Sequence, residues 1–266
     1  MPRPLSNTAR LKPISKSDNK GFFVRIREAF TSPWSKAVYV GRREIGTLAT
    51  LLLFAALTLT FGIVANEMSA GKTRAFDSAV VMALRSDANP SDPLGPMWFE
   101  GAVRDITSLG SNAVLAVVTL ATVGFLALSG ARGAALHVLI SVGSGAILMQ
   151  VLKEVFGRVR PDVVPQAVSE LTRSFPSGHA TLAAVTYLTL GALVARVQPK
   201  PAMKIYVLFV AILLTLLVGL SRVYLGVHWP TDVLAGWCLG SAWAIACWLV
   251  AVQLQRTGQI EKRIGA

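Results

Sequence analysis

Charged residues are scarce in this sequence. They make up 15% of the 266 residues, and only 14 of the residues are acidic, whereas hydrophobic residues make up 53%. This shortage argues against an ordinary soluble domain, in which about a quarter of the residues are charged. Together with a mean hydropathy of +0.55, it favours one helical domain that crosses a membrane several times.

Residues that bind metals or form disulfides are also few. The two cysteines, Cys238 and Cys247, lie within the last long apolar run of the chain. We expect them to be small apolar core residues, not a disulfide or a metal site. Elsewhere, Asp, Glu, His and Cys do not cluster with the spacing of a zinc or di-metal centre. The sequence therefore predicts an activity that uses no metal and no other cofactor.

The N-terminal segment 1–46 lacks the apolar core of a signal peptide. It is polar and basic, and we expect it to be a cytoplasmic tail. Apolar residues between Phe22 and Trp34 alternate with basic ones, which leaves two interpretations open. The stretch forms a short amphipathic helix on the inner membrane surface, or it is a disordered leader.

Long, nearly uncharged runs are what the chain has in abundance. Six of them, at about 20 residues each, are long enough to cross a hydrocarbon core of about 30 Å. They cover 47–65, 106–131, 133–152, 177–196, 205–221 and 230–255. The predicted fold is therefore all-α. A six-helix transmembrane domain at 47–255 lies between the tail 1–46 and a second cytoplasmic tail at 256–266.

The meaning of the net charge of +12 for possible partners depends on where the basic residues lie. Most of the 26 Lys and Arg fall in 1–46, in loops on the same side of the predicted membrane, and in the C-terminal tail. This distribution matches the positive-inside bias and an anionic lipid surface. We therefore expect a lipid bilayer as the partner and not nucleic acid, with both termini cytoplasmic in a bacterial inner membrane.

A polar stretch separates the first two apolar runs. Within it Phe76, Val80 and Leu84 recur at helical spacing, beside Asp77 and Arg85. Two interpretations stay open here. The stretch is an interfacial amphipathic helix close to the functional site, or it is a partly buried surface helix with no part in chemistry.

The most informative stretch runs from Ser221 to Asp232, at the edge of the predicted membrane. It contains Arg222, His228 and Asp232, and ionisable groups at such a position are costly unless they are paired or face water. His228 and Asp232 are one helical turn apart, so the carboxylate can hold a ring nitrogen and raise the basicity of the imidazole. This spacing predicts a nucleophilic or basic histidine.

Two earlier stretches supply groups that bind phosphate. Lys153 and Arg160 are seven residues apart, which on a helix places both on one face, and we expect Pro161 to end that helix. The sequence Pro-Ser-Gly-His at 176–179 opens a new apolar run. Its last three backbone N–H groups are expected at a helix N-terminus, which is a favourable place for a phosphate. The predicted topology brings all three stretches to the outer side.

Together these stretches resemble the three signatures of the type 2 phosphatidic acid phosphatase superfamily. Lys-x6-Arg-Pro begins at Lys153, Pro-Ser-Gly-His at Pro176 and Ser-Arg-x5-His-x3-Asp at Ser221, and every defining position matches. The signatures span 153–232, and the resemblance extends over about 76–252. Pro-Ser-Gly-His alone is a weak signal, whereas the three in this order are highly specific.

The resemblance implies a role for each signature residue. His228 attacks the phosphorus and forms a phosphohistidine, Asp232 orients its ring, and His179 protonates the leaving oxygen and then helps to activate water. The groups expected to bind the phosphate are Lys153, Arg160, Ser177, Gly178 and Arg222. Arg158 and Arg173 lie outside the signatures, and we expect them to be entrance or headgroup contacts only.

The signatures involve only phosphate, so they leave the substrate open. The resemblance implies a metal-independent phosphatase that acts on a lipid phosphate or diphosphate at the outer membrane face. The candidates are phosphatidic acid, phosphatidylglycerol phosphate, undecaprenyl diphosphate and lipid A 1-phosphate. One alternative is a vanadate-dependent haloperoxidase, because that class belongs to the same superfamily and uses a similar oxyanion cradle. The other is a non-enzymatic lipid transporter or binding protein, although no signature position is missing.

Overall fold

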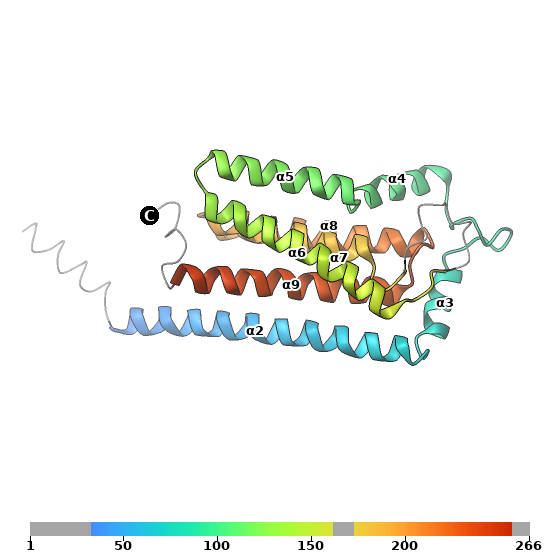
Figure 1. Ribbon diagram of the computed structural model, residues 1–266, viewed down its shortest axis with the longest axis horizontal. Helices are drawn as coiled ribbons and strands as arrows, with labels where there is room; N and C mark the ends of the chain where they lie inside the picture. Colours follow the sequence, from blue (N-terminus) through green and yellow to red (C-terminus); the bar gives the residue numbers. More distant parts are fainter. Residues whose placement is uncertain (1–32, 162–172, 257–266) are drawn as a thin grey trace, which may run out of the picture. The chain divides into compact units, whose positions relative to one another are not determined.

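The computed structural model describes residues 33–161 and 173–256. The chain divides into two compact units, 1–51 and 52–266, and the packing described below is that within the second unit. The helices of the described residues are α2 (Pro33–Ser69), α3 (Arg74–Met82), α4 (Met97–Ser108), α5 (Asn112–Leu128), α6 (Arg132–Phe156), α7 (Gly178–Val197), α8 (Pro201–Tyr224) and α9 (Pro230–Arg256) (Figure 1). Apart from one isolated bridge, these residues form no β-structure, and the all-α prediction is confirmed.

Five described helices are long and apolar enough to cross a membrane, and the pair α4 and α5 brings the number to six when counted as one span. The two helices of this pair are bent by 45° relative to each other. The bend follows Gly110, and α5 begins after Ser111, whose Oγ accepts a hydrogen bond from the Val114 N–H at 3.3 Å. The predicted span 106–131 is therefore not one straight helix.

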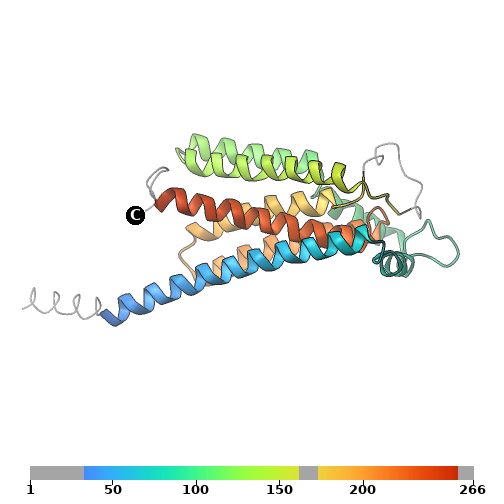
Figure 2. The same ribbon diagram turned by 60° about the horizontal axis from the view of Figure 1, so that its bottom comes forward.

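α7 is the central helix of the second unit. It packs against α5, α6, α8 and α9, and more than half of its length is buried. α9 runs alongside it in both views (Figures 1 and 2). Two glycines of α9 allow this close contact, because a Cβ at Gly240 would collide with the Thr181 carbonyl oxygen and one at Gly236 would lie 2.9 Å from that of Ser177. Small residues four apart are a common means of close helix packing in membranes.

α6 ends earlier than the sequence predicted. Its last residue is Phe156, and Gly157 follows in the left-handed conformation with φ of 60°, which a residue with a side chain rarely adopts. Arg160 and Pro161 therefore lie in the non-helical segment after α6. The prediction that Lys153 and Arg160 share one helix face is wrong.

α2 is longer than the predicted first span at both ends, because it covers Pro33–Ser69. Helical structure thus includes 33–46, which the sequence predicts to be part of the tail. The rest of the expected amphipathic segment, 22–32, lies outside the described residues, so that interpretation stays open.

Candidate active site

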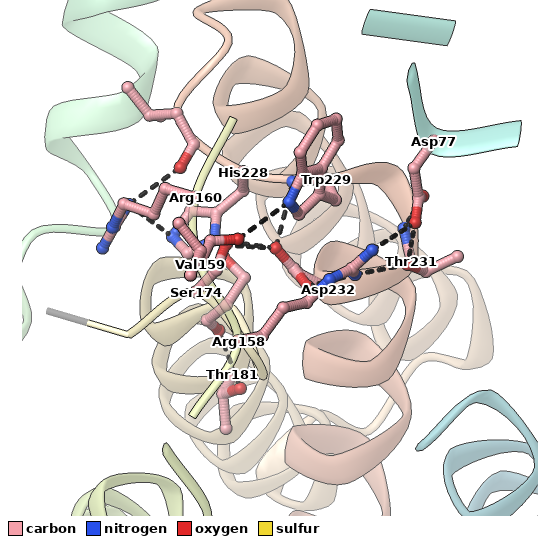
Figure 3. A network of polar contacts seen from close by, with 12 residues as sticks. Asp77, Arg158, Val159, Arg160, Ser174, Thr181, His228, Trp229, Thr231 and Asp232 are labelled. Carbon is pink, nitrogen blue, oxygen red and sulfur yellow. Dashed lines mark hydrogen bonds and ion pairs between the residues drawn. The ribbon is translucent and has the colours of Figure 1, made fainter. Parts of the chain in front are cut away.

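Polar side chains form a network (Figure 3) at the end of the bundle where α6 ends and α7 begins. The residues of the network come from α3, from the segments after α6, before α7 and between α8 and α9, and from the first turn of α9. The segment before α7 is anchored by Phe175, which is fully buried and packs against the rings of Phe61 and Phe156. This apolar contact fixes the polar residues on either side of Phe175 within the network.

Lys153 and Arg160 are both buried, each with 7% of its surface exposed. Arg160 Nη1 donates to the Val227 carbonyl oxygen at 2.8 Å and lies 3.2 Å from Nε2 of His228. Lys153 Nζ is 3.5 Å from the position that a Cβ on Gly178 would occupy, so the ammonium group lies over the start of α7. The two cations thus meet at the site although they do not share a helix.

Arg222 reaches the same region from the last turn of α8, and it is also buried. Its Nη1 contacts Oγ1 of Thr107 at 3.3 Å, near the bend between α4 and α5. At that bend a Cβ on Gly110 would lie 3.4 Å from the ring of His179, and Tyr187 donates to the Leu109 carbonyl oxygen at 2.7 Å. The bend between α4 and α5 therefore packs against Arg222, His179 and Tyr187.

His228 and Asp232 come together as predicted, but Ser174 joins them. The direct separation between His228 Nδ1 and Asp232 Oδ2 is 3.4 Å, whereas Ser174 Oγ lies 3.2 Å from the same Nδ1 and also donates to Asp232 Oδ2. The Trp229 N–H donates to this carboxylate oxygen at 3.0 Å. Ser174 is completely buried, and its sequence position gave no signal for this contact, because His228 and Asp232 lie 54 and 58 residues away.

The partners of His228 define its tautomer. A guanidinium has only donors, so the Nε2 that faces Arg160 must be the acceptor and carry the lone pair. The ring proton is then on Nδ1 and is donated towards Ser174 and Asp232. The nitrogen available as a nucleophile is therefore Nε2, which faces the cationic side of the site.

Burial lowers the pKa of His228 well below its ordinary value, and the nearby Arg160, Arg222 and Lys153 lower it further. The imidazole is accordingly neutral at neutral pH. A neutral ring keeps its lone pair, and the cations around it favour the binding of an anion beside it.

The expectation for Arg158 is wrong. Its side chain is 13% exposed and lies between two fully buried carboxylates, not at an entrance. Nη1 donates to Asp232 at 2.7 Å and Nη2 to Asp77 at 2.6 Å, and Nη1 also bonds Thr231 Oγ1 at 2.8 Å. Arg173, by contrast, is 47% exposed and binds Glu154. Sequence spacing gave no signal for the Arg158 network, because Asp77 is 81 residues away.

The N-terminus of α7 is where the sequence predicted it, since the helix begins at Gly178 after Ser177. One of the three expected amides is not directed to a ligand, because the Ser177 N–H donates to the Asp232 carbonyl oxygen at 3.0 Å. The Ser177 hydroxyl is fully buried, and within the part of the chain that the structure describes it has no hydrogen-bond partner. Such an orphaned donor suits an anion at this helix end.

His179 follows at the second position of α7, half-buried. It lies within electrostatic range of Arg222, His228, Lys153 and Arg160. The structure thus gathers every signature side chain at one end of the bundle. Within 33–161 and 173–256, no three His, Cys, Asp or Glu side chains are placed to hold a metal ion. The metal independence of the activity stays a prediction.

Comparison with known proteins decides the family. A family model described as the PAP2 superfamily matches residues 134–256. The chain is 33% identical over 188 residues to phosphatidylglycerophosphatase B of Bacillus subtilis, which covers 70% of this chain and 88% of that protein. The chain belongs to the PAP2 superfamily. PAP2 is the type 2 phosphatidic acid phosphatase family whose signatures the sequence resembles.

Two further comparisons extend this result. The crystal structure of a transmembrane PAP2 type phosphatidylglycerolphosphate phosphatase from Bacillus subtilis superposes with a TM-score of 0.68 at 30% identity, over 76% of this chain and 98% of that one. An undecaprenyl-diphosphatase of Sulfolobus acidocaldarius is 36% identical over 138 residues, which are 49% of this chain and 60% of that protein. With its apolar helices, this PAP2 protein is an integral membrane protein.

Proposed function

We propose that this PAP2 protein hydrolyses the terminal phosphate of a membrane lipid through a phosphohistidine on His228. As a PAP2 member whose relatives are named phosphatases, it is a phosphoric ester hydrolase that acts on lipids. The observation that carries the finer proposal is the Nε2 lone pair of His228, which faces Arg160 at 3.2 Å. A nucleophile and an anion-binding group at that distance can act on one phosphorus atom.

The first step transfers the phosphoryl group. His228 Nε2 forms a bond to phosphorus as the bond from phosphorus to the lipid oxygen breaks, and His179 gives a proton to that oxygen. Asp232 and Ser174 hold the Nδ1 proton while the ring becomes positively charged. The charge on the transferring oxygens is stabilised by Lys153, Arg160, Arg222, the Ser177 hydroxyl and the first amides of α7.

The second step releases phosphate. Water attacks the phosphorus, the bond to Nε2 breaks, and His179 accepts a proton from the water. His179 thus returns to its starting state with each turnover. The dianionic phosphate of an arriving substrate favours the protonated form of His179 among the surrounding cations, because it adds negative charge at the site.

The residues of the site bind the phosphate and do not determine which lipid carries it. We place phosphatidylglycerol phosphate first among the four candidates, because the similarity to the Bacillus protein of that name covers most of both chains. Undecaprenyl diphosphate comes second on the similarity to the Sulfolobus protein. The positive-inside bias supports cytoplasmic termini and an active site on the outer face of a bacterial inner membrane.

Phosphate release by the purified full-length protein tests the proposal. The panel contains the four candidate lipids, with and without a metal chelator. Release that is retained in chelator, with a phosphohistidine that is stable to base and labile to acid, is the expected result. A folded protein that releases phosphate from none of the four contradicts it. Peroxidase activity that requires vanadate would favour the haloperoxidase alternative, and lipid exchange between leaflets without hydrolysis would favour transport.

A further inference from the structure

A second site lies at the end of the bundle opposite the polar network. It is a cavity of about 860 Å³ between α6, α7 and α9. Most of its walls are apolar, and they include Leu136 and Ile140, which are 53% and 54% exposed on the outer surface of the bundle. In a bilayer such a surface is in contact with lipid. The cavity is therefore open to acyl chains.

The mouth of the cavity is cationic. Arg196 at the end of α7 and Lys204 at the start of α8 both line it, and none of the lining residues that the structure describes is Asp or Glu. Arg196 Nη2 donates to Gln255 Oε1 at 2.6 Å, a neutral partner that leaves its charge uncompensated. Among the described side chains, neither cation forms an ion pair.

Polar groups continue into the cavity. His137 lines it near the start of α6, and Thr189 lines it from α7. Thr189 is 4% exposed, and its hydroxyl has no partner within the described residues. A buried hydroxyl without a partner costs free energy unless a ligand or water satisfies it. The cavity thus combines apolar walls, an unsatisfied hydroxyl and two cations at its mouth.

We propose that this cavity binds an anionic glycerophospholipid, with the phosphate at Arg196 and Lys204 and one acyl chain between α6 and α9. Basic pockets between transmembrane helices on the cytoplasmic side are suited to anionic headgroups. This lipid is not the substrate, since it lies at the other end of the helices from His228. The proposal therefore does not depend on the reaction at the active site.

Native mass spectrometry of the full-length protein with added phosphatidylglycerol tests this site. The double variant Arg196→Gln/Lys204→Gln is expected to bind about tenfold less of the lipid, because each cation near an anionic headgroup contributes to affinity. The matched control is Arg132→Gln/Lys200→Gln, which removes two exposed cations near the same end that do not line the cavity. Equal losses in both double variants would overturn the proposal.

A filled cavity gives an independent test without a change in charge. Ala192→Phe places a ring among the lining residues and is expected to reduce binding, whereas Ala121→Phe on the exposed face of α5 is not. Binding is also measured for phosphatidylcholine with the same acyl chains, for glycerol phosphate and for inorganic phosphate. These probes show whether the cavity recognises the charged headgroup, the acyl chains or phosphate alone. We expect phosphatidylglycerol to bind best. Equal binding of phosphatidylcholine, or full binding of free phosphate alone, contradicts a lipid held by its charged headgroup.

A separate observation concerns Asp77, which lies on α3 and outside the residues that the family model matches. It is completely buried, and it accepts hydrogen bonds from Arg158 Nη2 at 2.6 Å, Thr231 N–H at 3.1 Å and Thr231 Oγ1 at 2.7 Å. Arg158 in turn binds Asp232. Asp77 thus holds both the arginine and the first turn of α9, from which Asp232 reaches His228.

We infer that Asp77 is a positioning residue for the phosphoryl transfer, an inference that rests on the proposed function. Asp77→Asn keeps the size and an acceptor oxygen but removes the charge that orients Arg158. We expect kcat to fall about tenfold with KM nearly unchanged, because misplacement affects the transition state more than lipid binding. The rate of phosphohistidine formation in a single turnover should fall by the same factor.

Two comparisons separate this role from a purely structural one. Asp77→Glu restores the charge and is expected to recover part of kcat, whereas Asp87→Asn on an exposed loop should have no effect. A lower thermal midpoint with unchanged kcat in the folded fraction contradicts the inference. If His228→Ala remains fully active, the proposed function fails instead, so the two failures are distinguishable.

Discussion

The two ends of the bundle both hold arginines, and they differ in how the charge of these arginines is balanced. At the active-site end, Arg158 lies between the buried carboxylates of Asp77 and Asp232. At the other end, the one partner of Arg196 among the side chains described is a glutamine, and Arg196 lines an open cavity. Internal ion pairs hold a side chain in one position, whereas an uncompensated cation is available to an exchangeable ligand. The first arrangement suits catalysis and the second suits lipid binding.

Replacing the proposed nucleophile should have the largest effect of all, and this effect should be confined to the active-site end. His228→Ala is expected to reduce turnover by on the order of 10⁴-fold or more, because the proposed mechanism forms the phosphoenzyme on the Nε2 of this residue. Phosphate release and trapping of the phosphoenzyme measure it. Phosphatidylglycerol binding at the opposite end should not change. Full activity in a folded His228→Ala protein would remove the nucleophile assignment.

The same substitution at each end tests the contrast directly. Arg158→Gln leaves two buried carboxylates without their cation and is expected to lower the free energy of unfolding by about 3–5 kcal/mol. Arg196→Gln removes an exposed charge and should leave the stability nearly unchanged. Thermal unfolding in one detergent compares the two variants. Equal destabilisation would mean that the charges of Arg158 and Arg196 are equally important for the fold.

Ser174→Ala should have a smaller effect on the active-site end. It removes the hydroxyl between His228 and Asp232 and leaves their direct contact of 3.4 Å. We expect kcat to fall about tenfold, as for the loss of one hydrogen bond to a charged group. Steady-state kinetics measure this, and Ser177→Ala provides a comparison, since its hydroxyl binds phosphate in the proposed mechanism and should also raise KM. An unchanged kcat in Ser174→Ala would show that the hydroxyl has no part in orienting the ring.

The protonation of His228 gives the least invasive test. Its pKa is lowered by burial and by Arg160, Arg222 and Lys153, so its ring should stay neutral at about pH 6, where a free histidine is largely protonated. Histidine ¹⁵N spectra of the folded protein, compared with those of His228→Ala, identify the signal. The unfolded protein serves as the reference. A ring that titrates at about 6.5 in the folded protein would contradict the buried, cation-lined site.

The sequence was sufficient for the helical architecture and for the convergence of the signatures, because both follow from local patterns. Apolar runs define spans, and residues such as His228 and Asp232 are one turn apart on the chain. The sequence did not reveal Ser174 or the role of Arg158, because their partners come from distant segments. It also misplaced the end of α6. Pro161 is a strong helix stop, but the left-handed Gly157 had already ended the helix.

The position of α7 has a consequence for how the protein is inserted into its membrane. Among the five candidate spans, α7 has the lowest mean hydropathy and the largest buried share, and Thr186 and Thr189 are both buried on it. Alone in lipid, this helix would expose hydroxyls that only its neighbours shield. We therefore expect α7 to leave the translocon poorly anchored until α8 and α9 follow it. The active site is therefore expected to form only after the last third of the chain has been synthesised.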